Sequence, residues 1–227
     1  MSSGIVVDVG GTSTRVAVHR DGILAGTPER FPTPSPRTDP ARPADDLREE
    51  LFDKIADRVR ALAAHEPAAG HELGVAFGAV VSDAGIVRDA SVLWLCPGTG
   101  FDVRAALRAR LPRARVKVLN DVSAAAWHYR GLGRFALVTV STGVAVKAFD
   151  ASYPPGRRVL VDRDGLGGET GHTVVAPEAV SGLPPGIGRA AADGDATARA
   201  ELERRGLPWC ECGAVADLAS FTSGPAV

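Results

Sequence analysis

The sequence has few cysteines, no long apolar run and almost no net charge. Three cysteines among 227 residues are too few for the disulfide framework of a small secreted domain. No apolar stretch approaches the roughly 20 residues that a membrane-spanning helix needs, and no basic segment followed by an apolar one opens the chain. These absences favour a cytoplasmic protein, and they make metal binding a use to consider for the closely spaced Cys210 and Cys212.

Charge of neither sign predominates. The formal net charge is −1, charged residues make up 23% and hydrophobic residues 45% of the chain. This balance argues against a disordered, membrane or nucleic-acid-coating protein and fits a soluble globular one, but it indicates no partner class. The length allows one large domain or two modest ones with a substantial core.

Short β-like runs alternate with helical ones along the first half of the chain. Aliphatic residues from Leu47 to Leu62 recur at spacings of four and three, which predicts a helix over 45–65 with one apolar face packed on a sheet. A second set of strands, 135–150, follows the Gly131-Leu132-Gly133 segment. We therefore expect a bilobed α/β chain. Further strands are expected over 4–9, 14–20, 22–31, 72–81, 85–94 and 114–120, and a second helix over 103–111.

The turn after the first expected strand carries residues that suit phosphate binding. Gly10 and Gly11 permit backbone angles closed to other residues, and backbone N–H groups there, with the hydroxyls of Thr12 and Ser13, would form a nest for phosphate oxygens. Asp8 could hold Mg²⁺ directly or through water. A plain hairpin would explain the glycines, but not the leading carboxylate and the trailing hydroxyls.

Asn120 and Asp121 stand where an expected strand gives way to an alanine-rich helix. Asp121 could cap that helix, since Asp at this position accepts hydrogen bonds from unpaired backbone amides. A carboxylate within reach of a substrate hydroxyl would also serve as a general base in phosphoryl transfer. The two roles are compatible with each other.

Several segments resemble, in the expected order, landmarks of the ROK family of sugar kinases and related repressors. The resemblance implies the two-lobed actin-like, ribonuclease H-like ATPase fold, with an N-terminal α/β lobe over 1–131 and a partial C-terminal α/β lobe over 132–227. The matching segments are DVGGTSTRVAV from Asp8, LNDVSAAAW from Leu119, VSTGVAVKAF from Val140, GGETGH from Gly167 and CECGAVADLASFTSG from Cys210.

The same resemblance implies an ATP- and Mg²⁺-dependent kinase acting on a hydroxyl of a hexose or related ring polyol. Asp121 would be the general base, and Asn120, Glu169 and His172 would hold the sugar. Asp8, Gly10, Gly11, Thr12, Ser13, Thr142 and Gly143 would bind phosphate and Mg²⁺. We expect a small-molecule sugar or polyol as partner, no nucleic acid and no membrane, and we consider a homodimer.

The sequence also departs from the family pattern. Ala145, Val146 and Lys147 replace later glycines of the second phosphate loop, and we expect Lys147 to face solvent. A tetrahedron of His172, Cys210, Cys212 and Asp217 could bind zinc, with Asp217 in place of the family's third cysteine. A vestigial site without metal is the alternative, and the long insertion before Cys210 leads us to expect substoichiometric zinc.

Two further departures bear on substrate and activity. Ser91 and Ala219 stand where related kinases have a sugar-binding Asn and Glu, so a modified hexose or cyclitol is expected to suit the pocket better than glucose. Family members run on beyond the segment matching Ser223-Gly224, so the adenosine pocket is expected to be incomplete. The alternative function is a non-catalytic sugar-binding or regulatory paralogue. A repressor is not expected, because the first phosphate loop leaves no room for a preceding DNA-binding helix-turn-helix.

Overall fold

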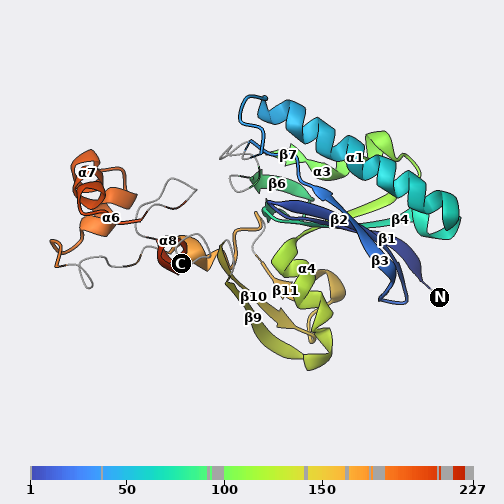
Figure 1. The fold of residues 1–227 in the computed structure, drawn as a ribbon. Helices are drawn as coiled ribbons and strands as arrows, with labels where there is room; N and C mark the ends of the chain where they lie inside the picture. The colour runs from blue at the N-terminus through green and yellow to red at the C-terminus, as the bar shows by residue number, and fades with distance from the viewer. Residues whose placement is uncertain are drawn as a thin grey trace. The chain divides into compact units, whose positions relative to one another are not determined.

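The protein forms two compact units in the computed structural model (Figure 1). Unit 1 is Met1–His128 with Asp162–Leu166, and unit 2 is Tyr129–Val161 with Gly167–Val227. No helix in the described part of the chain is long and apolar enough to cross a membrane. The structure describes residues 2–36, 38–90, 93, 100–140, 143–161, 164–173, 175, 182–208, 210 and 217–222.

Unit 1 is built on a five-stranded sheet with the order β3-β2-β1-β4-β8. The first three strands form an antiparallel meander, while β4 and β8 run parallel to β1. The bounds are β1 Ser3–Val9, β2 Ser13–Arg20, β3 Ile23–Pro32, β4 Glu72–Phe77 and β8 Arg115–Asn120.

The three parallel strands end at the same level. Val9 of β1 is in register with Phe77 of β4, and Phe77 is in register with Asn120 of β8. The residues that follow these strands therefore emerge side by side at the carboxyl edge of the sheet, where open α/β sheets bind their ligands.

Helix α1, Ala44–His65, covers one face of this sheet and confirms the helix predicted from the apolar repeat (Figure 1). Leu47, Leu51 and Ile55 are at most 1% exposed and pack in one core with Ile5 and Val7 of β1. Helix α3, Val103–Arg110, begins at Asp102, whose side chain accepts a hydrogen bond from the Ala105 N–H. Helix α4, Asp121–His128, lies on the opposite face (Figure 1).

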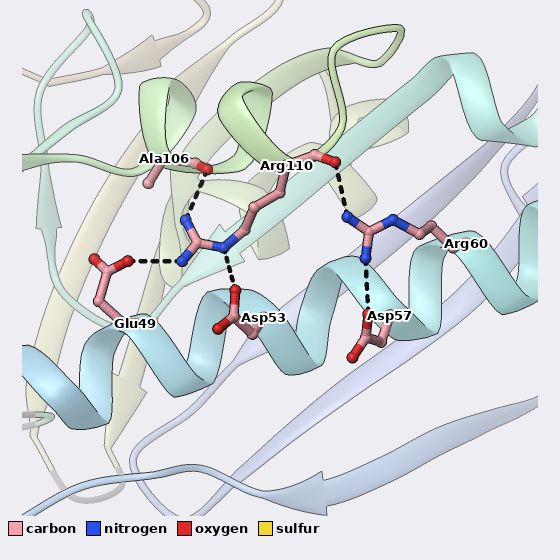
Figure 2. A network of polar contacts seen from close by, with 6 residues as sticks. All are labelled: Glu49, Asp53, Asp57, Arg60, Ala106 and Arg110. Atoms are coloured by element: carbon pink, nitrogen blue, oxygen red, sulfur yellow. Dashed lines mark hydrogen bonds and ion pairs between the residues drawn. The ribbon is translucent and has the colours of Figure 1, made fainter.

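Arg110 ties α3 to α1 (Figure 2). Its guanidinium lies 2.6 Å from a carboxylate oxygen of Glu49 and 2.6 Å from one of Asp53, and it donates to the carbonyl oxygen of Ala106 at 3.1 Å. Arg60 of α1 donates in return to the Arg110 carbonyl oxygen over 2.9 Å. These carboxylates hold the pKa of Arg110 above its usual value, chiefly through the hydrogen bond to Glu49.

A smaller sheet with the order β5-β6-β7 completes unit 1. Its strands are Val80–Val81, Ile86–Asp89 and Phe101–Asp102. The strand expected over 85–94 therefore ends at Asp89, and most of its remaining residues lie outside the described ones. Gly165 rejoins this sheet with φ +84°, and a Cβ atom there would lie 2.1 Å from the Val81 carbonyl oxygen, so only glycine fits.

Unit 2 contains a three-stranded antiparallel sheet with the order β11-β10-β9, in which Phe135 and Phe149 stack at 5.2 Å. β9 and β10 are the two strands predicted within 135–150. A small separate core contains Leu183, Ala191, Ala198 and Leu202. The bounds are β9 Arg134–Val140, β10 Val144–Asp150, β11 Val159–Leu160, α6 Ile187–Ala192, α7 Ala196–Arg204 and α8 Leu218–Thr222.

Candidate active site

The predicted phosphate turn links β1 to β2, and two hydrogen bonds from Thr33 stabilise it. The Thr33 hydroxyl donates to the Gly10 carbonyl oxygen over 2.7 Å, and its backbone N–H donates to the Thr12 carbonyl oxygen over 3.1 Å. Thr33 is fully buried and also contacts the hydroxyl of Thr14 at 2.9 Å. Its proline-rich surroundings gave no sign of this role in the sequence.

The reason for glycine at position 10 differs from the predicted one. Gly10 does not adopt a positive φ, but a Cβ atom there would lie 3.3 Å from the Ser13 carbonyl oxygen. The Gly10 N–H donates to that same oxygen over 3.2 Å. Close approach of the two sides of the turn, rather than an unusual backbone angle, therefore favours glycine at this position.

Asp8 is paired with Arg15, its direct neighbour across the β1–β2 ladder. Arg15 Nη1 lies 2.9 Å from Asp8 Oδ2, and both side chains are about half exposed. An exposed pair of this kind is weak, so a divalent cation could displace the arginine from the carboxylate. The sequence did not predict that Arg15 would lie next to the predicted phosphate turn and pair with Asp8.

Asn120, rather than Asp121, provides the side-chain cap of α4. Its Oδ1 accepts from the Ser123 N–H over 3.0 Å, the bond typical of an N-cap residue. Its Nδ2 donates to the Ala79 carbonyl oxygen over 3.1 Å and to Asp121 Oδ1 over 3.0 Å. Asn120 is 8% exposed. Its buried amide is therefore better placed to orient Asp121 than to bind a sugar hydroxyl.

Asp121 lies next to the phosphate turn. A Cβ atom added at Gly78, which follows β4, would lie 3.6 Å from Asp121 Oδ2, 3.8 Å from the Gly10 Cα and 3.0 Å from the Val9 carbonyl oxygen. Asp121 Oδ1 accepts from Asn120 and from the Val122 N–H over 2.8 Å. Unit 1 thus brings the Asp121 carboxylate and the glycine turn close to Gly78, at one sheet edge.

In unit 2, Glu169 is paired with a lysine that was expected to face solvent. Lys147 is 0% exposed, and its Nζ lies 3.0 Å from Glu169 Oε1 and 2.6 Å from the Gly167 carbonyl oxygen. The expectation was wrong because β10 alternates buried and half-buried residues and places Lys147 on the same face as Ala145 and Phe149.

His172, Cys210 and Asp217 converge in unit 2, with ligand atoms all within 4.8 Å of one another. His172 Nδ1 lies 3.2 Å from Asp217 Oδ2 and 3.7 Å from Cys210 Sγ. Asp217 is fully buried, and its Oδ1 accepts from the Ser220 N–H over 2.8 Å as the cap of α8. The three donors suit zinc, which binds nitrogen, sulfur and carboxylate ligands in a tetrahedron.

Other predicted residues contribute less. Thr142, Cys212 and Ser91 lie outside the described residues. Gly143 is exposed, and a Cβ atom there would meet nothing within 4 Å. Ala219 is 5% exposed and would lie 3.2 Å from a Cβ atom at Gly171, so its methyl group packs against the Gly171 backbone.

An open cavity of about 460 Å³ lies on the α4 side of the unit 1 sheet. Its lining is mostly aliphatic, with Asp8, Arg15 and Lys117 as the charged residues. Neither Asn120 nor Asp121 lines it. The cavity therefore adjoins the predicted site at Asp8 and Arg15 but does not include Asn120 or Asp121.

The sequence profile of the ROK family matches residues 4–227, and the chain belongs to this family. It is 32% identical, over 98% of its length, to the 2-epi-5-epi-valiolone 7-kinase of Actinoplanes sp.. The chain covers 55% of that relative. The predicted family is thereby confirmed.

Solved structures agree with the fold. The ROK family glucokinase from Streptomyces griseus in complex with glucose and AMPPNP matches 99% of this chain with a TM-score of 0.66 and 20% identity, and 58% of that protein is covered. The inorganic polyphosphate/ATP-glucomannokinase from Arthrobacter sp. strain KM matches 93% of the chain with a TM-score of 0.56 and 28% identity, and 74% of that protein is covered. These matches confirm the predicted α/β actin-like fold.

Proposed function

We propose that this chain transfers the terminal phosphate of ATP to a hydroxyl of a ring polyol, with a cyclitol or modified hexose preferred over glucose. In this proposal unit 1 is the N-terminal lobe of the kinase and unit 2 part of the C-terminal lobe. The observation that carries it is the common level of Val9, Phe77 and Asn120, which sets the phosphate turn beside Asp121.

Asp121 has the chemistry of a general base. Phosphoryl transfer depends mainly on positioning and charge stabilisation, and it needs one carboxylate to accept the proton of the attacking hydroxyl. Asn120 holds Asp121 Oδ1, while Oδ2 faces the space next to Gly78 and Gly10. Asp121 would take the proton on Oδ2 as the substrate oxygen attacks.

The phosphate turn would bind the nucleotide through its backbone N–H groups and the hydroxyls of Thr12 and Ser13. Asp8 is the carboxylate in unit 1 best placed to hold Mg²⁺, which when bound offsets phosphate charge. Arg15, which pairs with Asp8, is also close enough to the turn to contribute positive charge toward phosphate oxygens if Asp8 held the cation instead.

The proposed substrate class rests on what the site retains and what it lacks. Glu169 and His172 would accept and donate hydrogen bonds to ring hydroxyls. The buried Ala219 methyl group cannot do so. The curated relative at 32% identity is named for a carbocyclic substrate, which supports the cyclitol preference.

We further propose that His172, Cys210 and Asp217 hold a zinc ion. Their convergence supports this more strongly than the sequence did, because the long insertion before Cys210 does not keep the cysteine away from the histidine. Zinc would fix the position of His172, the last residue of the GGETGH segment.

Measurement of ADP release across a panel of 2-epi-5-epi-valiolone, other cyclitols, amino sugars and glucose tests the kinase. Asp121→Ala should lower kcat about 100-fold or more with at least one substrate. Asp57→Ala, which changes a 74% exposed carboxylate on α1, is the matched control and should retain activity. Equal activity in wild type and Asp121→Ala would remove the assignment of the base.

The second candidate is a sugar-binding protein without catalysis. It is favoured by the replacement of glycines in the second phosphate loop. One of the replacing residues, Lys147, forms a buried ion pair with Glu169 and therefore does not bind phosphate. Cyclitol binding in calorimetry without ADP release, under conditions where a kinase control is active, would support it over the first.

A further inference from the structure

Lys147 carries a fully buried ammonium group inside unit 2. A charge of this kind is costly to bury unless a counter-charge and hydrogen-bond acceptors surround it. The Gly167–Glu169 segment supplies both, through the Gly167 carbonyl oxygen at 2.6 Å and Glu169 Oε1 at 3.0 Å. Burial of Lys147 and the conformation of this segment therefore depend on each other.

We propose that Lys147 is a positioning residue that fixes Glu169 for substrate binding and restricts it to one free oxygen. The inference rests on the proposed function, because it assigns Glu169 to the polyol. Lys147 itself is 0% exposed, so it acts through Glu169 and does not touch the substrate.

The backbone next to Lys147 keeps the segment in place. The Val146 N–H donates to the Gly168 carbonyl oxygen over 2.8 Å. Gly168 has φ +90°, and a Cβ atom there would lie 1.8 Å from the Val146 carbonyl oxygen. The chain at Gly168 thus lies directly against β10, and Lys147 contacts the residues on both sides of it. The Glu169 side chain cannot turn away without leaving the buried ammonium without a counter-charge.

The ion pair also changes what Glu169 offers to a ligand. Oε1 is bound to the ammonium, and among the described residues the structure records no partner for Oε2. Glu169 is 20% exposed. A carboxylate with both oxygens open could accept from two neighbouring hydroxyls, whereas this one has Oε2 to accept from one. Such a site suits a ring whose hydroxyl pattern differs from that of glucose.

A double-mutant cycle separates positioning from general support of the fold. The variants are Lys147→Met, Glu169→Gln and the two combined, and the exposed Lys54→Met, which loses a pair with Glu50, is the control. Calorimetry with 2-epi-5-epi-valiolone gives the affinity without requiring phosphoryl transfer. Thermal melting of each variant reports on folding.

Lys147→Met should weaken cyclitol binding about tenfold, the usual effect of losing a hydrogen bond to a charged group. If Lys147 acts through Glu169, the combined variant should bind the cyclitol as Glu169→Gln does, and the two effects should not add. The combined variant should also melt above Lys147→Met, because it leaves no unpaired buried charge. Lys54→Met should bind as the wild type does.

Two outcomes would overturn the inference: wild-type affinity in Lys147→Met, or additive losses in the combined variant. Should Lys147→Met fail to fold, the comparison of the combined variant with Glu169→Gln still decides. Failure of the kinase proposal is distinct, since it appears as absent ADP release by the wild type across the panel. A wild type that does not bind the cyclitol would overturn the present inference while leaving the other panel substrates to test the kinase.

Discussion

Asn120 donates a hydrogen bond from Nδ2 to Oδ1 of Asp121 over 3.0 Å, while its own Oδ1 accepts from the Ser123 N–H. One side chain thus begins α4 and orients the carboxylate next to it. The side chain that accepts from the Ser123 N–H is therefore that of Asn120, whereas a helix cap by Asp121 was one of the two roles expected from the sequence.

Two substitutions at position 120 should separate these contributions. Asn120→Ser keeps an oxygen that can cap α4 but loses the amide donor to Asp121, whereas Asn120→Ala loses both. We expect kcat to fall about tenfold in each, and stability to fall by about 1 kcal/mol more in the alanine variant. Urea denaturation and steady-state kinetics measure the two effects. Full activity in Asn120→Ser would show that the amide does not orient the base.

Glu66 predicts a pH dependence of stability. The hydrogen bonds from Arg20 and then from Ser3 lower the pKa of Glu66, so its folded pKa lies below the unfolded value near 4.3. This stabilisation is present above the unfolded pKa and is lost as the pH falls through the folded one. Glu66→Gln should therefore melt below the wild type at pH 7, and the difference should shrink as the pH falls below the unfolded pKa and through the folded one. The exposed Glu203→Gln is the control, and a gap of constant size from pH 7 down to acid pH contradicts the assignment.

Arg110 should contribute to stability through packing as well as charge. Its side chain is 18% exposed and lies over the ring of Phe52, but the carboxylates it contacts are 58% and 65% exposed. Solvent screens such pairs, so Arg110→Met should cost about 1 kcal/mol, and less at high salt. Arg60→Met, at a 54% exposed position on α1, should cost less than about 0.5 kcal/mol. Equal losses in urea denaturation would contradict this ranking.

Zinc content can be measured directly. We expect elemental analysis of protein purified without added metal to find about one zinc per chain. Cys210→Ser and His172→Ala should lose it, with His65→Ala as control. Asp217→Asn removes the charge but keeps an oxygen that can accept from the Ser220 N–H. We therefore expect this variant to melt at the same temperature as wild-type protein from which the metal has been removed. Wild-type protein purified without zinc would contradict this prediction and favour the alternative, a vestigial site that binds no metal.

The sequence predicted best what depends on local periodicity. The α1 helix was expected over 45–65 and spans Ala44–His65, because its apolar repeat is complete within the segment itself. Strands were also expected over 4–9, 72–81 and 114–120, but their parallel pairing was not predicted, and the second of them divides into β4 and β5, which belong to different sheets. Family resemblance then supplied roles that spacing alone could not.

What the sequence could not predict depends on partners distant along the chain. Lys147 is buried because Glu169 and Gly167, 22 and 20 residues away, provide its acceptors. Thr33 supports the phosphate turn from across a hairpin. Asn120 and Asp121 are both good N-cap residues, so only the three-dimensional path of the chain decides between them.

The final prediction concerns the substrate. Ala219 is buried against Gly171, and Glu169 has one oxygen engaged by Lys147, so the proposed site would offer fewer acceptors to a hexose than the family pattern does. A site built to pair hydroxyls discriminates strongly when such contacts are missing. We expect kcat/KM for 2-epi-5-epi-valiolone to exceed that for glucose about tenfold or more. Steady-state kinetics on both, with Glu169→Gln as a variant that should narrow the gap, checks this. Glucose with the highest kcat/KM of the panel would refute the carbocyclic preference while leaving the kinase chemistry of Asp121 intact.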